Sequence, residues 1–192
     1  MAKIPYARIE DTPQKIRDFF AKMQANNPRL MNIHRMLAHS PASVREFLRF
    51  GNRLLARAEL DPRLRELVII RIAELHGASY EWVQHVPIAL SCGVSREQIE
   101  DMRNWRNSPL FSSEEKVVLA FTEEVIQNSR PSEKTFDRAA KFLNEASLVE
   151  LTLSIGYWSM VAMFLETFEV EVEDDLMEEI KDKLPDSMPG KS

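Results

Sequence analysis

The stretch that decides the fold is residues 61–93, DPRLRELVIIRIAELHGASYEWVQHVPIALSCG. Asp61 followed by Pro62 is a strong helix start, because an aspartate caps the first turn and proline suits the first helical position. Apolar residues then recur at helical spacing as far as Gly77, and a second run continues from Ser79 to a stop at Gly93. This stretch therefore predicts two consecutive helices joined by a tight turn.

Similar signals on both sides of this pair predict further helices. The chain has only five glycines, and its longest segments show helical rather than alternating apolar spacing. We expect helices over residues 13–23, 30–38, 41–55 after a Ser40 cap, 96–103 after a Ser95–Gln98 capping box, 113–126 after Ser112 or Ser113, 132–143 and 148–168. The fold class expected is an all-α helical bundle.

Composition excludes several classes of protein. The 192 residues carry a net charge of -5, and the lysines and arginines are interspersed with acids, so we expect no nucleic-acid partner. Residues 1–8 contain no apolar signal core, which favours a cytoplasmic protein. The most apolar run, Leu151 to Leu165, is shorter than a membrane-spanning helix, so we expect no membrane partner and a core or subunit-interface helix instead.

The expected helix over residues 148–168 is apolar on nearly every side. Such a helix needs neighbours all round, which a chain of this size supplies either by placing it at the centre of the bundle or by self-association. A homo-oligomer would use as anchors the large apolar side chains of this helix: Tyr157, Trp158, Met160, Met163 and Phe164.

The best candidate for chemistry is Glu81 with His85, four residues apart on one expected helix face. A carboxylate beside an imidazole can fix its tautomer and raise its pKa, which prepares a histidine for proton transfer near neutral pH. The plainer interpretation is an ordinary surface pair worth a few tenths of a kcal/mol. Glu66 lies inside an apolar run, so it either faces solvent or has a specific partner.

The Arg-Glu-Leu-Val-Ile-Ile-Arg segment beginning at Arg65, together with Tyr80-Glu-Trp-Val-Gln-His85, resembles the carboxymuconolactone decarboxylase family, which shares its fold with the AhpD-like alkylhydroperoxidases. The resemblance extends over residues 54–172, after an N-terminal helical extension of residues 1–53 and before a C-terminal helix and flexible tail in residues 173–192. A short likeness between residues 64–69 and 148–153, each a helix start with a glutamate, leaves a worn internal duplication or a chance echo open.

The resemblance implies a specific chemistry. In the peroxidase branch of the family a CxxC pair precedes the histidine, and those cysteines would fall at Ala78 and Glu81 here. Since both thiols are missing, the resemblance favours a cofactor-free enzyme of the decarboxylase type, with a small carboxylated or lactone substrate and His85 as proton donor. Glu81 would hold the imidazole, and Glu66 would position the other ring nitrogen or the substrate.

Other roles stay open at this stage. Tyr80 and Trp82 are candidate substrate-binding residues, although aromatics at helical spacing are more often core residues. Cys92, the single cysteine, would support peroxidase or other oxidoreductase chemistry only with an external thiol, and a non-catalytic ligand-binding oligomer is a third alternative. One histidine and two carboxylates could hold a divalent ion, but HExxH is absent, and we expect neither a metal nor a cofactor.

Overall fold

The computed structural model describes residues 1–25 and 29–185, and these form helices joined by turns, without a strand. The α-helices in chain order are α1 (Gln14–Gln24), α2 (Asn32–Leu37), α3 (Val44–Ala56), α4 (Pro62–His76), α5 (Ser79–Ser91), α6 (Arg96–Glu100), α7 (Ser113–Asn128), α8 (Glu133–Ala139), α9 (Glu145–Phe168) and α10 (Asp174–Ile180). The prediction of an all-α bundle is confirmed. The flexible tail expected at the C-terminus falls on residues 186–192, outside the described residues.

Most helix ends follow the predicted capping chemistry. The Asp61 carboxylate accepts hydrogen bonds from the backbone N–H groups of Arg63 and Leu64, and Gly77 ends α4 in the left-handed conformation. The Ser95 and Ser112 capping boxes also form. The Ser40 cap is wrong, because residues 41–43 form a separate turn and α3 begins at Val44.

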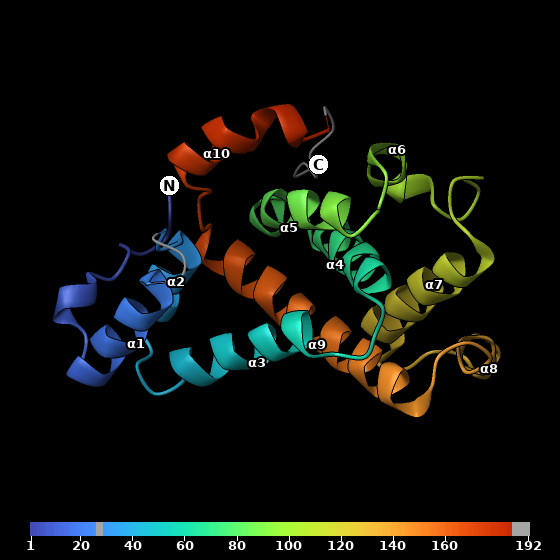
Figure 1. The fold of residues 1–192 in the computed structure, drawn as a ribbon, viewed down its shortest axis with the longest axis horizontal. Helices are drawn as coiled ribbons and strands as arrows, with labels where there is room; N and C mark the ends of the chain where they lie inside the picture. The colour runs from blue at the N-terminus through green and yellow to red at the C-terminus, as the bar shows by residue number, and fades with distance from the viewer. Residues whose placement is uncertain (26–28, 186–192) are drawn as a thin grey trace.

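Helix α4 is the centre of the bundle. It packs against α5, α7 and α9, and Figure 1 shows it beside α5 with α9 crossing the middle of the molecule. Val68, Ile69 and Ile72 belong to an apolar core shared with α7, α9 and the N-terminal helices. Leu67 and Ile70 belong to a second core, which α5, α6 and α10 cover. Because apolar residues surround α4, its position fixes both halves of the fold.

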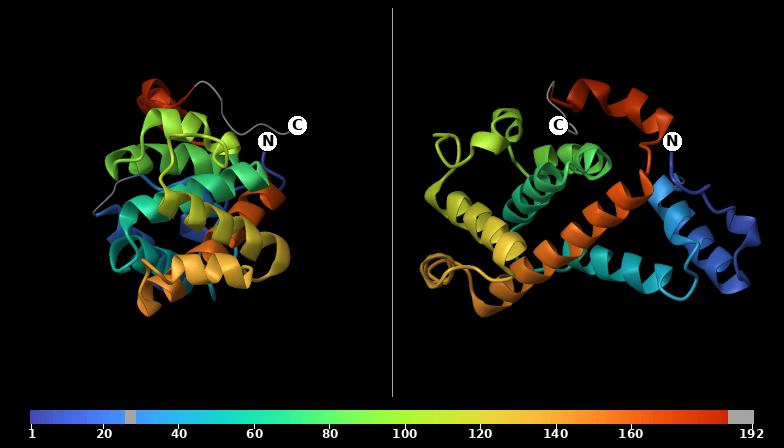
Figure 2. Two further views of the ribbon diagram at one scale, coloured as in Figure 1. Left: turned by 90° about the vertical axis from the view of Figure 1, so that its right-hand side faces the viewer. Right: turned by 180° about the vertical axis from the view of Figure 1, so that it is seen from behind.

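Helix α9 crosses the bundle beside α4 but keeps one side exposed. Tyr157 and Trp158 are buried within the chain, whereas Met160 and Met163 are exposed. Viewed from behind in Figure 2, the helix runs between the α4–α5 pair and α3. By length and composition alone it would be apolar enough to span a membrane, with a mean hydropathy of 1.6, but core helices of soluble proteins meet the same criterion. Its contacts with α4, α5, α7 and α3 make it a core helix here.

Gly51 allows α3 to approach α9 closely. A Cβ atom at this position would lie 2.6 Å from Cζ of Tyr157 and still closer to the hydroxyl oxygen. The glycine therefore lets the Tyr157 hydroxyl pass α3 and donate a 3.1 Å hydrogen bond to the carbonyl of Phe47. The glycine that looks like a weak point in the helix is required by packing.

We expect Gly51→Ala to lower the free energy of unfolding by about 1–3 kcal/mol, because the new methyl group overlaps the Tyr157 ring. Gly156→Ala is the matched control. This second glycine also lies inside a helix, and a Cβ there would meet nothing within 4 Å. Alanine should therefore raise the free energy of unfolding by roughly 0.5–1 kcal/mol. Urea unfolding followed by circular dichroism measures both, and equal effects of the two substitutions would contradict the packing argument.

Candidate active site

A cavity of about 190 Å³ lies between α3, α5 and α9 and is called the α5 cavity below. From α5 it receives Tyr80, Glu81, Gln84, His85 and Ile88, which lie on one face because their spacing follows the helical period. Its other walls are Met31 with Ile33 and His34 of α2, Phe47, Leu48, Gly51, Asn52 and Leu55 of α3, and Tyr157, Trp158, Val161 and Leu165 of α9. The exposed lining residues Asn52 and Ile88 mark its mouth.

His85 is held from behind by Glu66 of the neighbouring helix. The Nδ1 atom of His85 lies 2.8 Å from Oε2 of Glu66, and both side chains are buried. The other carboxylate oxygen of Glu66 accepts a 3.1 Å hydrogen bond from Arg65. Glu66 thus has the specific partners that its position in an apolar run required. With Nδ1 bonded to a carboxylate, Nε2 is the nitrogen that the ring has available for a molecule in the α5 cavity.

Glu81 is buried without a partner. Its side chain is 1% exposed, and neither carboxylate oxygen has a hydrogen bond in the structure. Burial raises the pKa of Glu81 well above its usual value. The helix dipole near the start of α5 favours the ionised form, but burial without a partner outweighs it. Burial therefore favours the neutral carboxylic acid form of Glu81, which can donate a hydrogen bond or a proton at the α5 cavity.

Glu81 is exceptional among the buried carboxylates that the structure describes. The other four each contact a cationic or hydrogen-bond-donating side chain: Glu66 with Arg65 and His85, Glu115 with Arg63 and Gln98, Glu123 with Arg71 and Trp105, and Glu173 with Tyr80 and Gln84. An unpaired buried polar group costs folding free energy. The presence of the unpaired Glu81 carboxyl group in a cavity beside a positioned histidine is typical of a functional residue.

Two aromatic residues of α9 complete the wall opposite α5. The Trp158 ring meets the His85 ring edge to face, with centroids 4.5 Å apart, and Tyr157 packs against Trp158 at 5.0 Å. Burial raises the pKa of Tyr157, so the phenol stays neutral near pH 7. The indole Nε1 of Trp158 is buried without a hydrogen-bond partner. It is a second unused polar group at this cavity.

His34 and Tyr80 bound the side of the cavity near α2. Burial lowers the pKa of His34 to about 4, so this imidazole is neutral near pH 7. The Tyr80 hydroxyl donates a 2.8 Å hydrogen bond to Glu173, whose other oxygen accepts one from Gln84. Tyr80 therefore lines the cavity while its hydroxyl is engaged in fastening the segment before α10.

Of the five residues expected at the site, three line the α5 cavity, one lies behind His85 and one lies in the core. Glu81, His85 and Tyr80 line the α5 cavity, and Glu66 lies directly behind His85. The expected role of Glu81 as the partner of the imidazole is wrong, because Glu66 occupies Nδ1 and Glu81 is without a hydrogen bond. Trp82 is fully buried in the second core and does not line the cavity, because two residues turn a helix by about 200° from Tyr80.

Cys92 is the only thiol in the chain, and it caps the far end of α5. It is partly exposed and does not line the α5 cavity. Within residues 1–25 and 29–185, no three histidine, cysteine or acidic side chains are grouped closely enough to hold a metal ion.

The sequence profile of the carboxymuconolactone decarboxylase family matches residues 41–124, which include α3, α4, α5 and hence both Glu66 and His85. This match supports the resemblance to the carboxymuconolactone decarboxylase family over these residues. Two proteins similar to this chain in sequence are named as uncharacterised. YnjA of Escherichia coli is 29% identical over 61% of this chain and 65% of its own length, and YdfG of Bacillus subtilis is 23% identical over 56% and 76%.

Solved structures extend the family resemblance to the whole fold. A peroxidase-related protein with an alkylhydroperoxidase AhpD core from Ralstonia eutropha superimposes with a TM-score of 0.81 over 96% of this chain and 97% of its own, at 16% identity. The debrominase Bmp8, solved as a cysteine-to-alanine variant with 2,3,4-tribromopyrrole, gives 0.75 over 95% and 100%, also at 16% identity. At this identity the likeness shows the fold alone: this chain has the AhpD-like fold.

Sequence reasoning missed three residues of this cavity, for different reasons. Tyr157 and Trp158 were expected as anchors of a subunit interface, and they lie 5% and 7% exposed inside the single chain. His34 has no acidic neighbour at helical spacing, so its sequence surroundings predict no functional role. The adjacent aromatic pair in an apolar helix was the available signal for the first two, while nothing local marked His34.

Replacing Glu81 with glutamine should stabilise the protein more at pH 8 than at pH 5. The unfolded chain loses the Glu81 proton above the ordinary pKa of 4.5, whereas the folded protein keeps it up to a higher pH. The free energy of unfolding therefore falls as pH rises from about 4.5 towards the raised pKa of the folded protein. Glutamine has no proton to lose and removes this penalty. Urea unfolding at both pH values measures the difference.

Glu115→Gln is the control for this experiment. Glu115 is also buried, but its carboxylate lies 2.6 Å from Arg63, so the substitution should destabilise the protein at pH 8. A Glu81→Gln protein that loses stability at pH 8, as the control does, would contradict a neutral Glu81.

Proposed function

We propose that this protein is a cofactor-free acid/base enzyme that moves a proton next to the carbonyl group of a small substrate in the α5 cavity. The observation that carries the proposal is the meeting of two kinds of proton-handling group at one cavity. One is an imidazole fixed at Nδ1 by a buried carboxylate, and the other is a carboxylic acid kept neutral by burial. Pairs of titratable groups in contrasting surroundings are typical of acid/base catalysis.

The geometry suggests a role for each group. Nε2 of His85 would exchange a proton with the substrate carbon, while Glu66 acts as a positioning residue that fixes the ring. Glu81 would donate a hydrogen bond to the carbonyl oxygen, where negative charge develops as an enolate forms. These roles differ from those first expected, because Glu66 rather than Glu81 is bonded to the imidazole.

Decarboxylation is the form of this chemistry that the family name favours, with a small carboxylated or lactone substrate. The bond between the carboxylate carbon and the adjacent carbon would break, its electron pair would enter the enolate, and carbon dioxide would leave. Protonated His85 would then deliver a proton to the carbon, which restores the carbonyl and leaves the imidazole neutral. On a lactone without a carboxylate the same groups would shift a proton between two ring carbons.

Peroxidase chemistry is the second candidate, and it is favoured by the likeness in fold to the peroxidase-related protein of Ralstonia eutropha. In this chain the single thiol, Cys92, is outside the α5 cavity and has no second cysteine with which to form a disulfide. A thiol mechanism would therefore need an external thiol and would leave His85 and Glu81 without a role.

The test is a screen of small lactones, β-keto acids and carboxylated lactones for carbon dioxide release or for uptake of solvent deuterium beside the carbonyl. We expect His85→Gln to lower kcat/KM on any active substrate by about 10²–10⁴-fold, the usual contribution of a general acid or base. Glu66→Gln should lower kcat and shift the pH profile, since the ring loses its charged partner, and Glu81→Gln should lower kcat with little change in KM.

Cys92→Ala is the matched control, because it changes the only thiol without touching the cavity. Its turnover should equal that of the unmodified protein. Loss of peroxide reduction in Cys92→Ala, with His85→Gln fully active, would replace this proposal with thiol chemistry. Binding without turnover across the screen would favour a non-catalytic ligand-binding protein.

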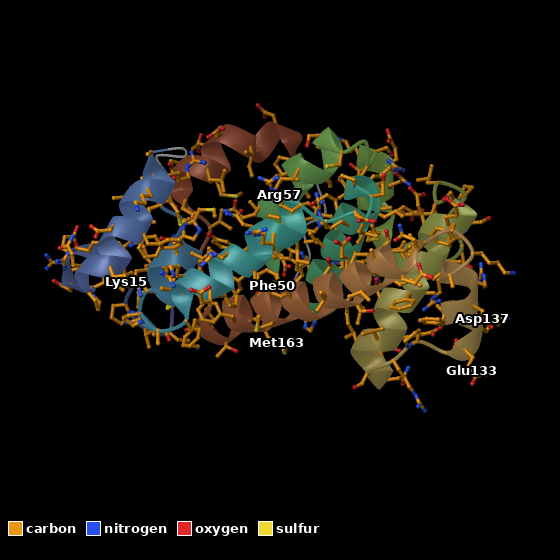
Figure 3. All side chains as sticks on the ribbon, turned by 60° about the horizontal axis from the view of Figure 1, so that its bottom comes forward. Lys15, Phe50, Arg57, Glu133, Asp137 and Met163 are labelled. Carbon is orange, nitrogen blue, oxygen red and sulfur yellow. The ribbon has the colours of Figure 1, made fainter. Side chains whose placement is uncertain are left out.

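We further propose that the protein forms a homo-oligomer through the exposed side of α9. Four large apolar residues on this helix are exposed by 42–58%: Val149, Leu153, Met160 and Met163. Their spacing of four, seven and three residues keeps them on one stripe of the helix. Figure 3 shows Met163 on the same face of the molecule as Phe50. Phe50 is an exposed aromatic residue of α3, and it enlarges this apolar surface.

Light scattering after size-exclusion chromatography tests this assembly. The unmodified protein should elute as a dimer or larger, and Leu153→Glu with Met163→Glu should shift it to the mass of one chain. Leu110→Glu is the control, since Leu110 is as exposed (44%) but lies in the turn before α7. A single-chain mass for the unmodified protein would contradict the proposal.

A further inference from the structure

The lining of the α5 cavity contains no positively charged side chain of the lysine or arginine type. Seventeen described residues line it, and none is a Lys or Arg although the chain has 25 of them. Arg65 is 5% exposed and is bonded to Glu66 behind the histidine, so it is not available to a ligand in the cavity. A site built for a carboxylate ordinarily supplies a guanidinium or an ammonium group.

Glu81, the acidic residue of the cavity wall, offers an anionic ligand no positive charge in either protonation state. A neutral Glu81 offers a ligand a hydrogen bond but no charge, and an ionised Glu81 would repel an anion. The other titratable groups that face the cavity are His34, Tyr80, Tyr157 and His85. The Glu66 carboxylate, 2.8 Å from His85, would offset a positive charge on the imidazole and so weaken the attraction of His85 for a second anion.

The size and walls of the cavity favour one planar ring. An apolar cavity of about 150 Å³ accommodates benzene, so about 190 Å³ admits a ring with one small polar substituent. Phe47, Tyr157 and Trp158 present aromatic surfaces to it. The Trp158 indole N–H and the Glu81 carboxyl group are both buried without partners and lack an acceptor such as a carbonyl oxygen.

We infer that the α5 cavity selects uncharged single-ring ligands bearing a carbonyl group and rejects carboxylates of the same shape. This inference deepens the proposed function and rests on the same cavity. It narrows the substrate class from carboxylated compounds or lactones to uncharged ring carbonyl compounds such as lactones. The corresponding reaction is a proton shift beside the carbonyl, in which one C–H bond breaks and another forms, without loss of carbon dioxide.

Benzamide and benzoate test the inference, because they share one shape and differ in charge at pH 7. The reporter is the indole N–H signal of Trp158 in nitrogen-15 spectra, assigned among the three tryptophans with Trp158→Phe. We expect benzamide to shift this signal and to bind at least about tenfold more tightly than benzoate, since an unpaired buried charge is costly. Equal binding, tighter benzoate binding or no binding of either compound at 10 mM, about the upper limit for such weak ligands, would overturn the inference.

A cation placed at the mouth should weaken the preference for benzamide over benzoate. Asn52 is exposed and lines the cavity, so Asn52→Arg should raise benzoate affinity by about fivefold or more, equivalent to roughly 1 kcal/mol. Asn128→Arg is the matched control. It adds the same charge at an exposed position of α7 outside the cavity and should change neither affinity. Unchanged benzoate binding by Asn52→Arg would show that charge is not the cause of the selectivity.

The binding measurement separates this inference from the catalytic proposal. His85→Gln removes the proton-handling imidazole but adds no charge, so it should abolish turnover and keep the preference for benzamide. Selective benzamide binding in a protein without turnover would contradict the proposed function alone. Efficient turnover of carboxylated substrates, with benzoate bound more tightly than benzamide, would contradict this inference alone.

Discussion

The hydrogen bond between Glu66 and His85 is the interaction on which the rest of the site depends. Glu66 is fully buried in α4, the helix surrounded by both apolar cores, so its carboxylate needs partners that only neighbouring side chains can supply. Arg65 supplies one and His85 of α5 supplies the other. This bond sets how α5 faces α4 and turns the remaining nitrogen of the imidazole toward the α5 cavity.

The same arrangement leaves a different situation for Glu81. It is one turn before His85 on α5 and makes none of the hydrogen bonds that satisfy Glu66, and burial without a partner favours its protonated form. Two buried glutamates therefore have opposite characters. One holds the histidine, and the other is a proton donor facing an apolar cavity. The proposed chemistry and the proposed preference for uncharged ligands both follow from this contrast.

Local sequence patterns were sufficient for the helices and for part of the site. The Asp61 cap, the Gly77 and Gly93 stops and the two capping boxes act within a few residues, so the chain encodes them directly. The shared face of Glu81 and His85 follows from helical spacing. Tyr80 is at the cavity but Trp82 is not, and Tyr157 and Trp158 lie inside the chain, because helix packing decides which face of each helix is covered.

Capping and periodicity are local properties, so the sequence is enough to predict a helical bundle with a carboxylate and an imidazole on one face of a helix. Which glutamate bonds the imidazole, how α9 closes the cavity and why residue 51 is a glycine depend on how the helices pack. Those features depend on side chains distant in sequence: 19 residues separate Glu66 from His85, and 110 separate Phe47 from Tyr157. Partner choice and desolvation arise only when the helices pack together.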